Sequence, residues 1–184
     1  WSVADTPKDI IVHLDAYISP YLALAAGQFS DAHPTELKNA IIRLRNCNLP
    51  STTYPFLMRM IKAVEEGKLD VKMAVSTSEA LESFLVRRAI TGIEPSGLLV
   101  FFRTAWESMN GQPSWDAFAE ALKKRTTIEW PNDDRVKTAI LSRRIYRVGI
   151  KNYLLSEYDR SLGADVPKDN PWIEHVLPQS ISDD

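Results

Sequence analysis

The chain has 184 residues, of which 45% are hydrophobic and 25% are charged, and this balance excludes wholesale disorder. Its length suits one medium domain, or one domain with a piece of a second. The 22 basic and 24 acidic side chains give a net charge of -2, which excludes a surface that is basic overall. Any DNA contact must therefore come from a local patch or from a missing part.

The first predicted element is an amphipathic helix over residues 10–22, where apolar residues recur at three- and four-residue spacing. Pro20 lies inside this stripe and is expected to kink the helix or to split it near Ser19, because proline has no backbone N–H. A second helix is predicted from about Thr35 to a point before Asn48.

The next two predicted helices have clear start and stop residues. Pro55 suits the first turn of the third helix, and Gly67 is expected to end it. Asp70 is expected to cap a fourth helix that runs to Gly92. Residues 76–78, in the middle of that helix, are the weak helix formers Ser, Thr and Ser, so they mark a candidate break.

The second half of the chain predicts four more helices. The first is expected over residues 96–109, and the second begins after the capping residue Ser114. The third is expected from Asp133 through Tyr146, and the fourth around Tyr153 up to Gly163. Gly149 is expected inside or between these last two helices.

The end of the chain has a different character. Residues 171–178 are bounded by prolines and rich in strand formers, and they give the only convincing strand signal. We therefore predict an all-α fold, a bundle-like domain of about seven to eight helices over residues 1–162. A loop and a short extended tail are expected over residues 163–184.

Cysteine content and hydropathy limit where the protein works. The single cysteine, Cys47, excludes an internal disulfide and a Cys-rich zinc site, and its thiol is expected to be reduced and buried. No apolar run approaches the ~18 residues of a membrane span, and no signal peptide pattern is visible. We expect a cytoplasmic protein with no membrane contact. Because the chain begins at Trp1 and stops at Asp184, we also expect an internal fragment.

Glu174 and His175 form the most interesting pair of polar residues. A carboxylate beside an imidazole can bind a divalent metal and deprotonate a water, which is the minimum for phosphodiester hydrolysis. Adjacent side chains of a straight strand point to opposite faces, however. Spacing alone therefore also fits a terminal dipeptide without function.

The residues around this pair resemble a known family. Residues 173–179 are similar to the "EHILPQ" signature that opens the HNH nuclease domain of GmrSD-type restriction enzymes. Earlier stretches resemble the linker region of the same family. Residues 54–69 are similar to its "YPFLL…EGKL" segment, and residues 82–92 are similar to its "ESFLVRRAICG" segment. Residues 130–133 and 153–155 fit the run that leads into the nuclease. The similarity covers roughly residues 40–180, in the family's order.

This resemblance implies a fragment of an anti-phage, modification-dependent DNA restriction endonuclease. In that family an N-terminal ParB-like domain handles nucleotide, and the C-terminal HNH domain hydrolyses DNA with a divalent metal such as Mg²⁺ or Mn²⁺. By carry-over, His175 would be the general base that activates water, and Glu174 would be a metal ligand. The ParB-like domain and the rest of the nuclease are absent from the sequence, so we expect this fragment to bind no metal and to be inactive alone.

Two basic clusters are candidates for DNA contact. Arg143, Arg147 and Lys151 would share one face of a helix at i, i+4 and i+8, just before the nuclease signature. Arg87 and Arg88 form the second cluster, which would hold a DNA phosphate or contact a neighbouring domain. A solvated helix face is the alternative for the first cluster. For the second, the alternative is that one arginine pairs with a carboxylate such as Glu82 or Glu79.

The remaining candidates have structural interpretations. His13 and His33 are isolated from other ligand-type residues, and Lys123–Arg125 is expected to be a helix C-terminus. Trp106, Trp115 and Trp130 fall at core or rim positions, although an exposed tryptophan can stack on a base.

Two functions therefore compete. The first is the helical connector of a GmrSD-like endonuclease, which would relay a signal between the nucleotide-handling and cutting domains or present DNA. The second is a non-catalytic helical protein–protein interaction module, which an exposed apolar groove without a basic face would favour.

Overall fold

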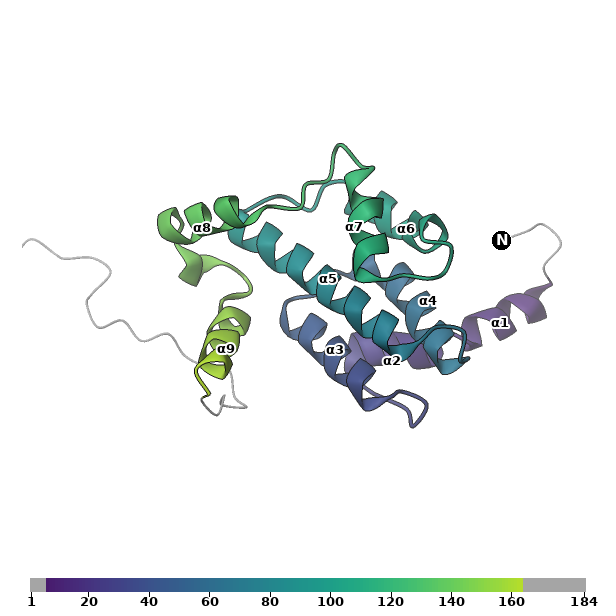
Figure 1. Ribbon diagram of the computed structural model, residues 1–184. Coiled ribbons are helices and arrows are strands. Elements are labelled where there is room, and N and C mark those ends of the chain that lie inside the picture. Colours follow the sequence, from purple (N-terminus) through teal and green to yellow (C-terminus); the bar gives the residue numbers. More distant parts are fainter. Residues whose placement is uncertain (1–5, 164–184) are drawn as a thin grey trace, which may run out of the picture.

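A computed structural model describes residues 6–163, and every regular element within this part of the chain is helical (Figure 1). The all-α prediction is therefore confirmed for these residues. In chain order the elements are α1 (Pro7–Asp15), α2 (Ile18–Ala26), α3 (Thr35–Asn46), the 3-10 helix η1 (Ser51–Thr53), α4 (Tyr54–Glu65), α5 (Val71–Thr91), α6 (Leu98–Ser108), α7 (Trp115–Lys123), α8 (Asp133–Ser142), the 3-10 helix η2 (Ile145–Arg147) and α9 (Lys151–Ser161).

The long helix α5 is the centre of the fold. It packs against α3, α4, α7 and α8, while α4 also packs against α2 and α6. Figure 1 shows α1 at one end of the molecule and α9 at the opposite end. No helix within residues 6–163 is both long enough and apolar enough to cross a membrane.

An aromatic cluster fills the core between α4, α5, α6 and α7. The ring of Phe118 lies 6.3 Å from Phe56 and 6.1 Å from Phe84, measured between centroids, and all three side chains are fully buried. Phe101 and Phe102 complete the cluster from α6. Burying each such ring contributes about 1.5–3 kcal/mol to stability. The cluster therefore holds the four helices in one body.

The first predicted helix is two helices, which accounts for one helix more than the sequence suggested. The break lies between Asp15 and Ile18, earlier than the expected Ser19. Pro20 is buried in the first turn of α2, where its missing N–H leaves no hydrogen bond unmade. Of the two predicted outcomes, a kink or a split, the split is confirmed, and it falls at residues 16–17.

The expected break in the middle of α5 is absent, because that helix runs without interruption from Val71 to Thr91. The hydroxyl groups of Thr77 and Ser78 donate hydrogen bonds of 2.8 Å to the carbonyl groups four residues earlier. These side chains are buried. Their polar groups are thus satisfied inside the helix, and packing on both sides overrides their weak helix propensity.

Four start and stop residues behave as predicted, namely Pro55, Gly67, Asp70 and Ser114. The helix predicted from Asp133 through Tyr146 was too long, because α8 ends at Ser142 and Tyr146 lies in η2. Pro55 lies in the first turn of α4, and Gly67 follows that helix with a φ of 65°. The Asp70 carboxylate accepts the N–H of the second residue of α5, and the Ser114 hydroxyl accepts the N–H of the third residue of α7. Each cap satisfies a donor that a helix start leaves without a partner, a contribution of ~1 kcal/mol.

Candidate functional site

The predicted catalytic pair, Glu174 and His175, lies outside the described residues, as does the strand predicted over residues 171–178. Within residues 6–163 no group of three or more His, Cys, Asp or Glu side chains could hold a metal ion. What the structure does describe is the end of the molecule that leads to these residues, formed by α8, η2 and α9.

The first predicted DNA-binding cluster does not lie on one helix face. Helix α8 ends at Ser142, Arg143 adopts an extended conformation, Arg147 closes η2, and Lys151 begins α9. The predicted shared face was therefore wrong. Gly149 lies between the helices, one of the two placements that the sequence allowed.

Arg143 turns back to the end of α5 instead. Its guanidinium donates hydrogen bonds to the carbonyl groups of Ala89, at 3.4 Å, and of Ile90. It also lies against Gly92, which ends α5 with a φ of 70°, and a Cβ built on Gly92 would stand 2.5 Å from Nη2 of Arg143. The positive charge thus meets the carbonyl end of the helix, where it is favourable.

Arg87 and Arg88 hold the same end of α5 to the loops around it. Arg88 is buried, and its guanidinium donates to the carbonyl groups of Glu129, at 3.0 Å, and of Glu94. Burial lowers the pKa of the Arg88 guanidinium from its ordinary value. Arg87 pairs with Asp133 at 2.6 Å, at the start of α8. One arginine does pair with a carboxylate, as the alternative had it, but that carboxylate is Asp133 and neither Glu82 nor Glu79. The Glu82 carboxylate accepts from Arg43 instead.

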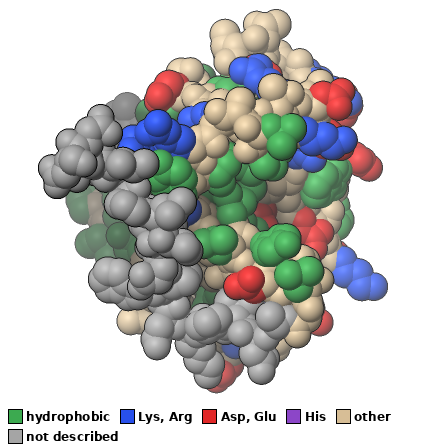
Figure 2. All heavy atoms as spheres, turned by 90° about the vertical axis from the view of Figure 1, so that its left-hand side faces the viewer, with side chains coloured by type: hydrophobic (Ala, Val, Ile, Leu, Met, Phe, Trp, Pro, Cys, Tyr) green, Lys and Arg blue, Asp and Glu red, His purple; other side chains and the backbone are tan. Residues whose placement is uncertain are grey.

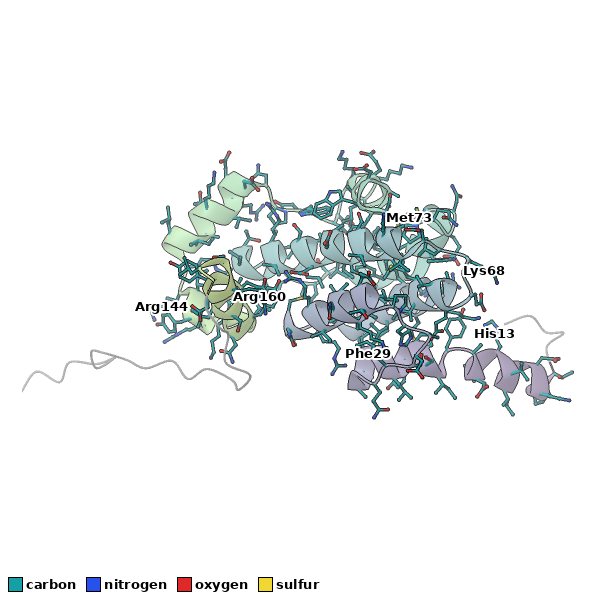
Figure 3. The ribbon with its side chains drawn as sticks, turned by 60° about the horizontal axis from the view of Figure 1, so that its bottom comes forward. His13, Phe29, Lys68, Met73, Arg144 and Arg160 are labelled. Atoms are coloured by element: carbon teal, nitrogen blue, oxygen red, sulfur yellow. The ribbon has the colours of Figure 1, made fainter. Side chains whose placement is uncertain are left out.

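The exposed basic side chains of this end include Arg144 and Arg147, with Lys151 half-buried, and also Arg135 and Lys137 on α8. The Arg147 guanidinium stands 5.7 Å from the centroid of the Tyr146 ring. Figure 3 shows Arg144 and Arg160 at this end of the molecule, and the Arg160 side chain pairs with Glu157.

Apolar side chains are exposed on the same end. Figure 2 looks at this end and shows hydrophobic side chains gathered in the middle of the face, with both basic and acidic side chains around them. Leu141 is 89% exposed, and Tyr158 and Leu162 on and after α9 are exposed as well. A surface of this kind suits contact with a further protein domain.

A polar network fixes α9 to the helical body. The guanidinium of Arg43 in α3 donates to both carboxylate oxygens of Glu82 in α5, at 3.0 and 2.6 Å, and to the Glu157 carboxylate in α9 at 3.0 Å. The Tyr153 phenol of α9 also donates to Glu82. Three helices are thus joined through one buried carboxylate, and bidentate pairs of this kind are directional as well as strong.

The network shifts the pKa values of its members. Burial, and then the hydrogen bond to Glu82, raises the pKa of the Tyr153 phenol. The hydrogen bond to Glu82 raises the pKa of the Arg43 guanidinium. Cys47 is buried nearby, as the sequence predicts, and burial together with the charge of Glu82 raises the pKa of its thiol to about 12. The thiol is therefore protonated and inert at neutral pH.

Sequence reasoning missed this network. One signal was present, because Glu82 lies four residues after Ser78 and three before Leu85, on the buried stripe of α5. A buried carboxylate needs a partner. Its partners stand 39 and 71 residues away along the chain, and no local pattern locates them. The chain matches no protein-family model, no curated protein and no solved structure.

Proposed function

We propose that the chain is the helical connector of a GmrSD-like, modification-dependent DNA endonuclease, and that residues 171–178 begin its HNH site. The observation that carries this proposal is the set of stretches 54–69, 82–92 and 173–179, which resemble the family in the family's order. Support also comes from the fold, since the first two stretches build α4, the Gly67 turn and the C-terminal part of α5.

The connector would transmit movement from one domain to the other. Helix α9 precedes the nuclease signature and is joined to α3 and α5 by the Arg43–Glu82–Tyr153–Glu157 network. A displacement of α5 would therefore be passed to α9, since a packed helix moves as one piece. This supports a relay between the nucleotide-handling and cutting domains of the intact protein.

Contact with DNA would fall to Arg147 and Lys151. The guanidinium groups of Arg87, Arg88 and Arg143 already donate to carbonyl or carboxylate groups of the chain. Arg147 is exposed and Lys151 is half-buried at the end that leads to residue 164. Cations placed there would position a phosphodiester backbone without reading its sequence.

In the intact enzyme, a divalent metal such as Mg²⁺ or Mn²⁺ would stabilise the charge that develops on the phosphate. Glu174 would hold it, and His175 would take the proton of the attacking water. The fragment by itself would not cut DNA. As a defence enzyme that acts on incoming phage DNA, the parent protein would work in the cytoplasm.

The test is a nicking assay on the full-length gene product that contains this chain, with modified and unmodified DNA and with Mg²⁺ or Mn²⁺. We expect metal-dependent cleavage that the His175→Ala variant loses. Glu79→Ala is the control, because Glu79 is an exposed residue of α5 that belongs neither to the proposed HNH site nor to the α8–α9 end, and its replacement should leave cleavage unchanged. Cleavage that survives His175→Ala would remove His175 from the mechanism.

The second candidate, a non-catalytic interaction module, is favoured by one observation. Leu141, Tyr158 and Leu162 are exposed together at the α8–α9 end. A protein that cuts no modified phage DNA but loses a protein partner when Leu141 is changed to Asp would have this function instead.

A further inference from the structure

A cavity of about 540 Å³ lies at the end of the molecule opposite α9. Its wall combines the α1–α2 junction, the last turns of α4, the Gly67 turn, and the C-terminal end of α6 with the turn after it. Figure 3 shows His13 and Lys68, two of its lining residues, together at this end. The volume falls within the ~300–1,000 Å³ of small-molecule sites.

The wall of this cavity is cationic. Among the described residues that line it, Arg59, Lys62 and Lys68 are positive, whereas Glu66 is the only carboxylate. Lys62 and Lys68 share the two oxygens of that one carboxylate, Lys68 at 2.7 Å. One negative charge for two ammonium groups leaves positive charge at the mouth of the cavity.

The partner of Arg59 stands outside the lining. Arg59 pairs with Glu107, and this hydrogen bond lowers the pKa of the Glu107 carboxyl. The side chains of Arg59 and Glu107 are 41% and 58% exposed. An ion pair in that position contributes ~0–1 kcal/mol, so a phosphate that enters the cavity can compete for the Arg59 guanidinium.

Two aromatic rings complete the wall, those of Tyr17 and Trp106. The Lys62 ammonium stands 5.8 Å from the centroid of the Tyr17 ring. Trp106 packs against Phe56 on one side, with ring centroids 6.4 Å apart. On another side it meets Gly111, where a built Cβ would stand 3.4 Å from the indole Nε1.

The indole is held in place by the turn after α6. The N–H of Gly111 donates to the Trp106 carbonyl at 3.0 Å, and both Asn110 and Gly111 have positive φ. Glycine at 111 allows this conformation and leaves room for the ring. A ring fixed in this way loses little conformational entropy when a ligand stacks on it.

We infer that this cavity binds one nucleotide unit, with its base against Trp106 and Tyr17 and its phosphate toward Arg59, Lys62 and Lys68. A simple anion would use the cations and leave the rings without a role, and an apolar ligand would use the rings and make no contact with the excess positive charge. Bases stack on aromatic side chains whatever their sequence, while cations hold the phosphate. The inference does not rest on the nuclease proposal, because the cavity lies away from the α8–α9 end.

The experiment measures fluorescence anisotropy of a labelled single-stranded DNA of about six nucleotides at low salt, a length within the range of single-strand sites. Lys68→Glu is the main variant, because its side chain is 71% exposed and its replacement leaves the core intact. Lys123→Glu is the matched control, since Lys123 is 72% exposed and also pairs with a neighbouring glutamate, at 2.6 Å.

We expect Lys68→Glu and Trp106→Ala each to weaken binding by about tenfold or more, and Lys123→Glu to leave it unchanged. Competition by AMP would assign the site to free nucleotides, and its absence would assign the site to a unit of a strand. The inference is overturned if the oligonucleotide does not bind, if Lys123→Glu weakens binding as much as Lys68→Glu, or if the folded Trp106→Ala protein binds as well as wild type and pyrophosphate displaces the probe.

Discussion

The Tyr153 phenol of α9 donates a hydrogen bond to the Glu82 carboxylate of α5, across 71 residues of chain. The same carboxylate receives two hydrogen bonds from Arg43 of α3. Glu82 is therefore one point at which the last described helix is attached to the rest of the fold, beside the direct pair of Arg43 with Glu157. The proposed relay depends on these contacts.

Removing the Glu82 carboxylate should loosen α9. Glu82→Ala leaves the Tyr153 hydroxyl and one edge of the Arg43 guanidinium without their partner, so the free energy of unfolding should fall by ~1–3 kcal/mol. The lower part of that range is expected, because Arg43 keeps 40% of its side chain exposed to water. Urea denaturation followed by circular dichroism measures the change.

Glu79→Ala is the control for this experiment, because Glu79 is an exposed residue on the same helix. It should change stability by less than ~0.5 kcal/mol. Hydrogen exchange should in addition show faster exchange of the α9 amides in Glu82→Ala. Equal exchange of α9 in both variants would show that other contacts hold this helix.

Gly92→Ala tests the contact between the end of α5 and Arg143. Alanine must adopt the left-handed conformation of residue 92, which costs ~1 kcal/mol, and its Cβ must also displace the Arg143 guanidinium. Gly67→Ala has the same conformational cost but meets no atom within 4 Å. We expect Gly92→Ala to lower the melting temperature more than Gly67→Ala. Comparing Gly92→Ala with the double variant Gly92→Ala, Arg143→Ala isolates the contribution of the clash with the Arg143 side chain. Equal effects of the two glycine variants would contradict the contact between residue 92 and Arg143.

The buried thiol of Cys47 should give a pH signature. Because its folded pKa is raised to about 12 from an ordinary value of 9.0, the stability linked to the protonated thiol is fully present below pH 9.0. It is then lost as pH rises toward 12. The free energy of unfolding should therefore fall more steeply in this window for the wild type than for Cys47→Ala.

Thiol labelling checks the same residue independently. At neutral pH, iodoacetamide should react slowly with the native protein and rapidly after unfolding in guanidinium, since the thiolate is the reactive form. Rapid labelling of the native protein would show that Cys47 is accessible and that burial does not set its pKa.

Charge reversal at Arg147 and Lys151 tests the proposed DNA contact in the full-length gene product. The double variant Arg147→Glu, Lys151→Glu should weaken DNA binding whatever the sequence, and it should reduce the slope of log affinity against log salt by about 2. Lys123→Glu with Lys124→Glu makes the same change of charge on α7 and at its end. If the two double variants have equal effects, overall charge is responsible and the α8–α9 end is not the contact.

The amino-acid sequence by itself determined most helix starts and stops, because their signals are local. The apolar spacing, the caps at Asp70 and Ser114, and the glycine after α4 each act within a few residues of chain. At residues 76–78, the candidate break, local helix propensity did not decide the structure. There, tertiary burial and hydrogen bonds inside α5 outweighed weak helix formers.

Only the tertiary structure decided what the charged residues do. Arg143, Arg87 and Arg88 looked like candidates for DNA contact in the sequence, yet their guanidinium groups hold the end of α5 to α8 and to the loops beside it. Likewise, the partners of Glu82 and the grouping of Trp106 with Lys68 come from segments far apart in the chain. A long charged side chain bonds to whichever acceptor the fold brings near it. The fold itself is set by the burial of apolar side chains, and their pattern in the sequence does not indicate which acceptor a given arginine or lysine will meet.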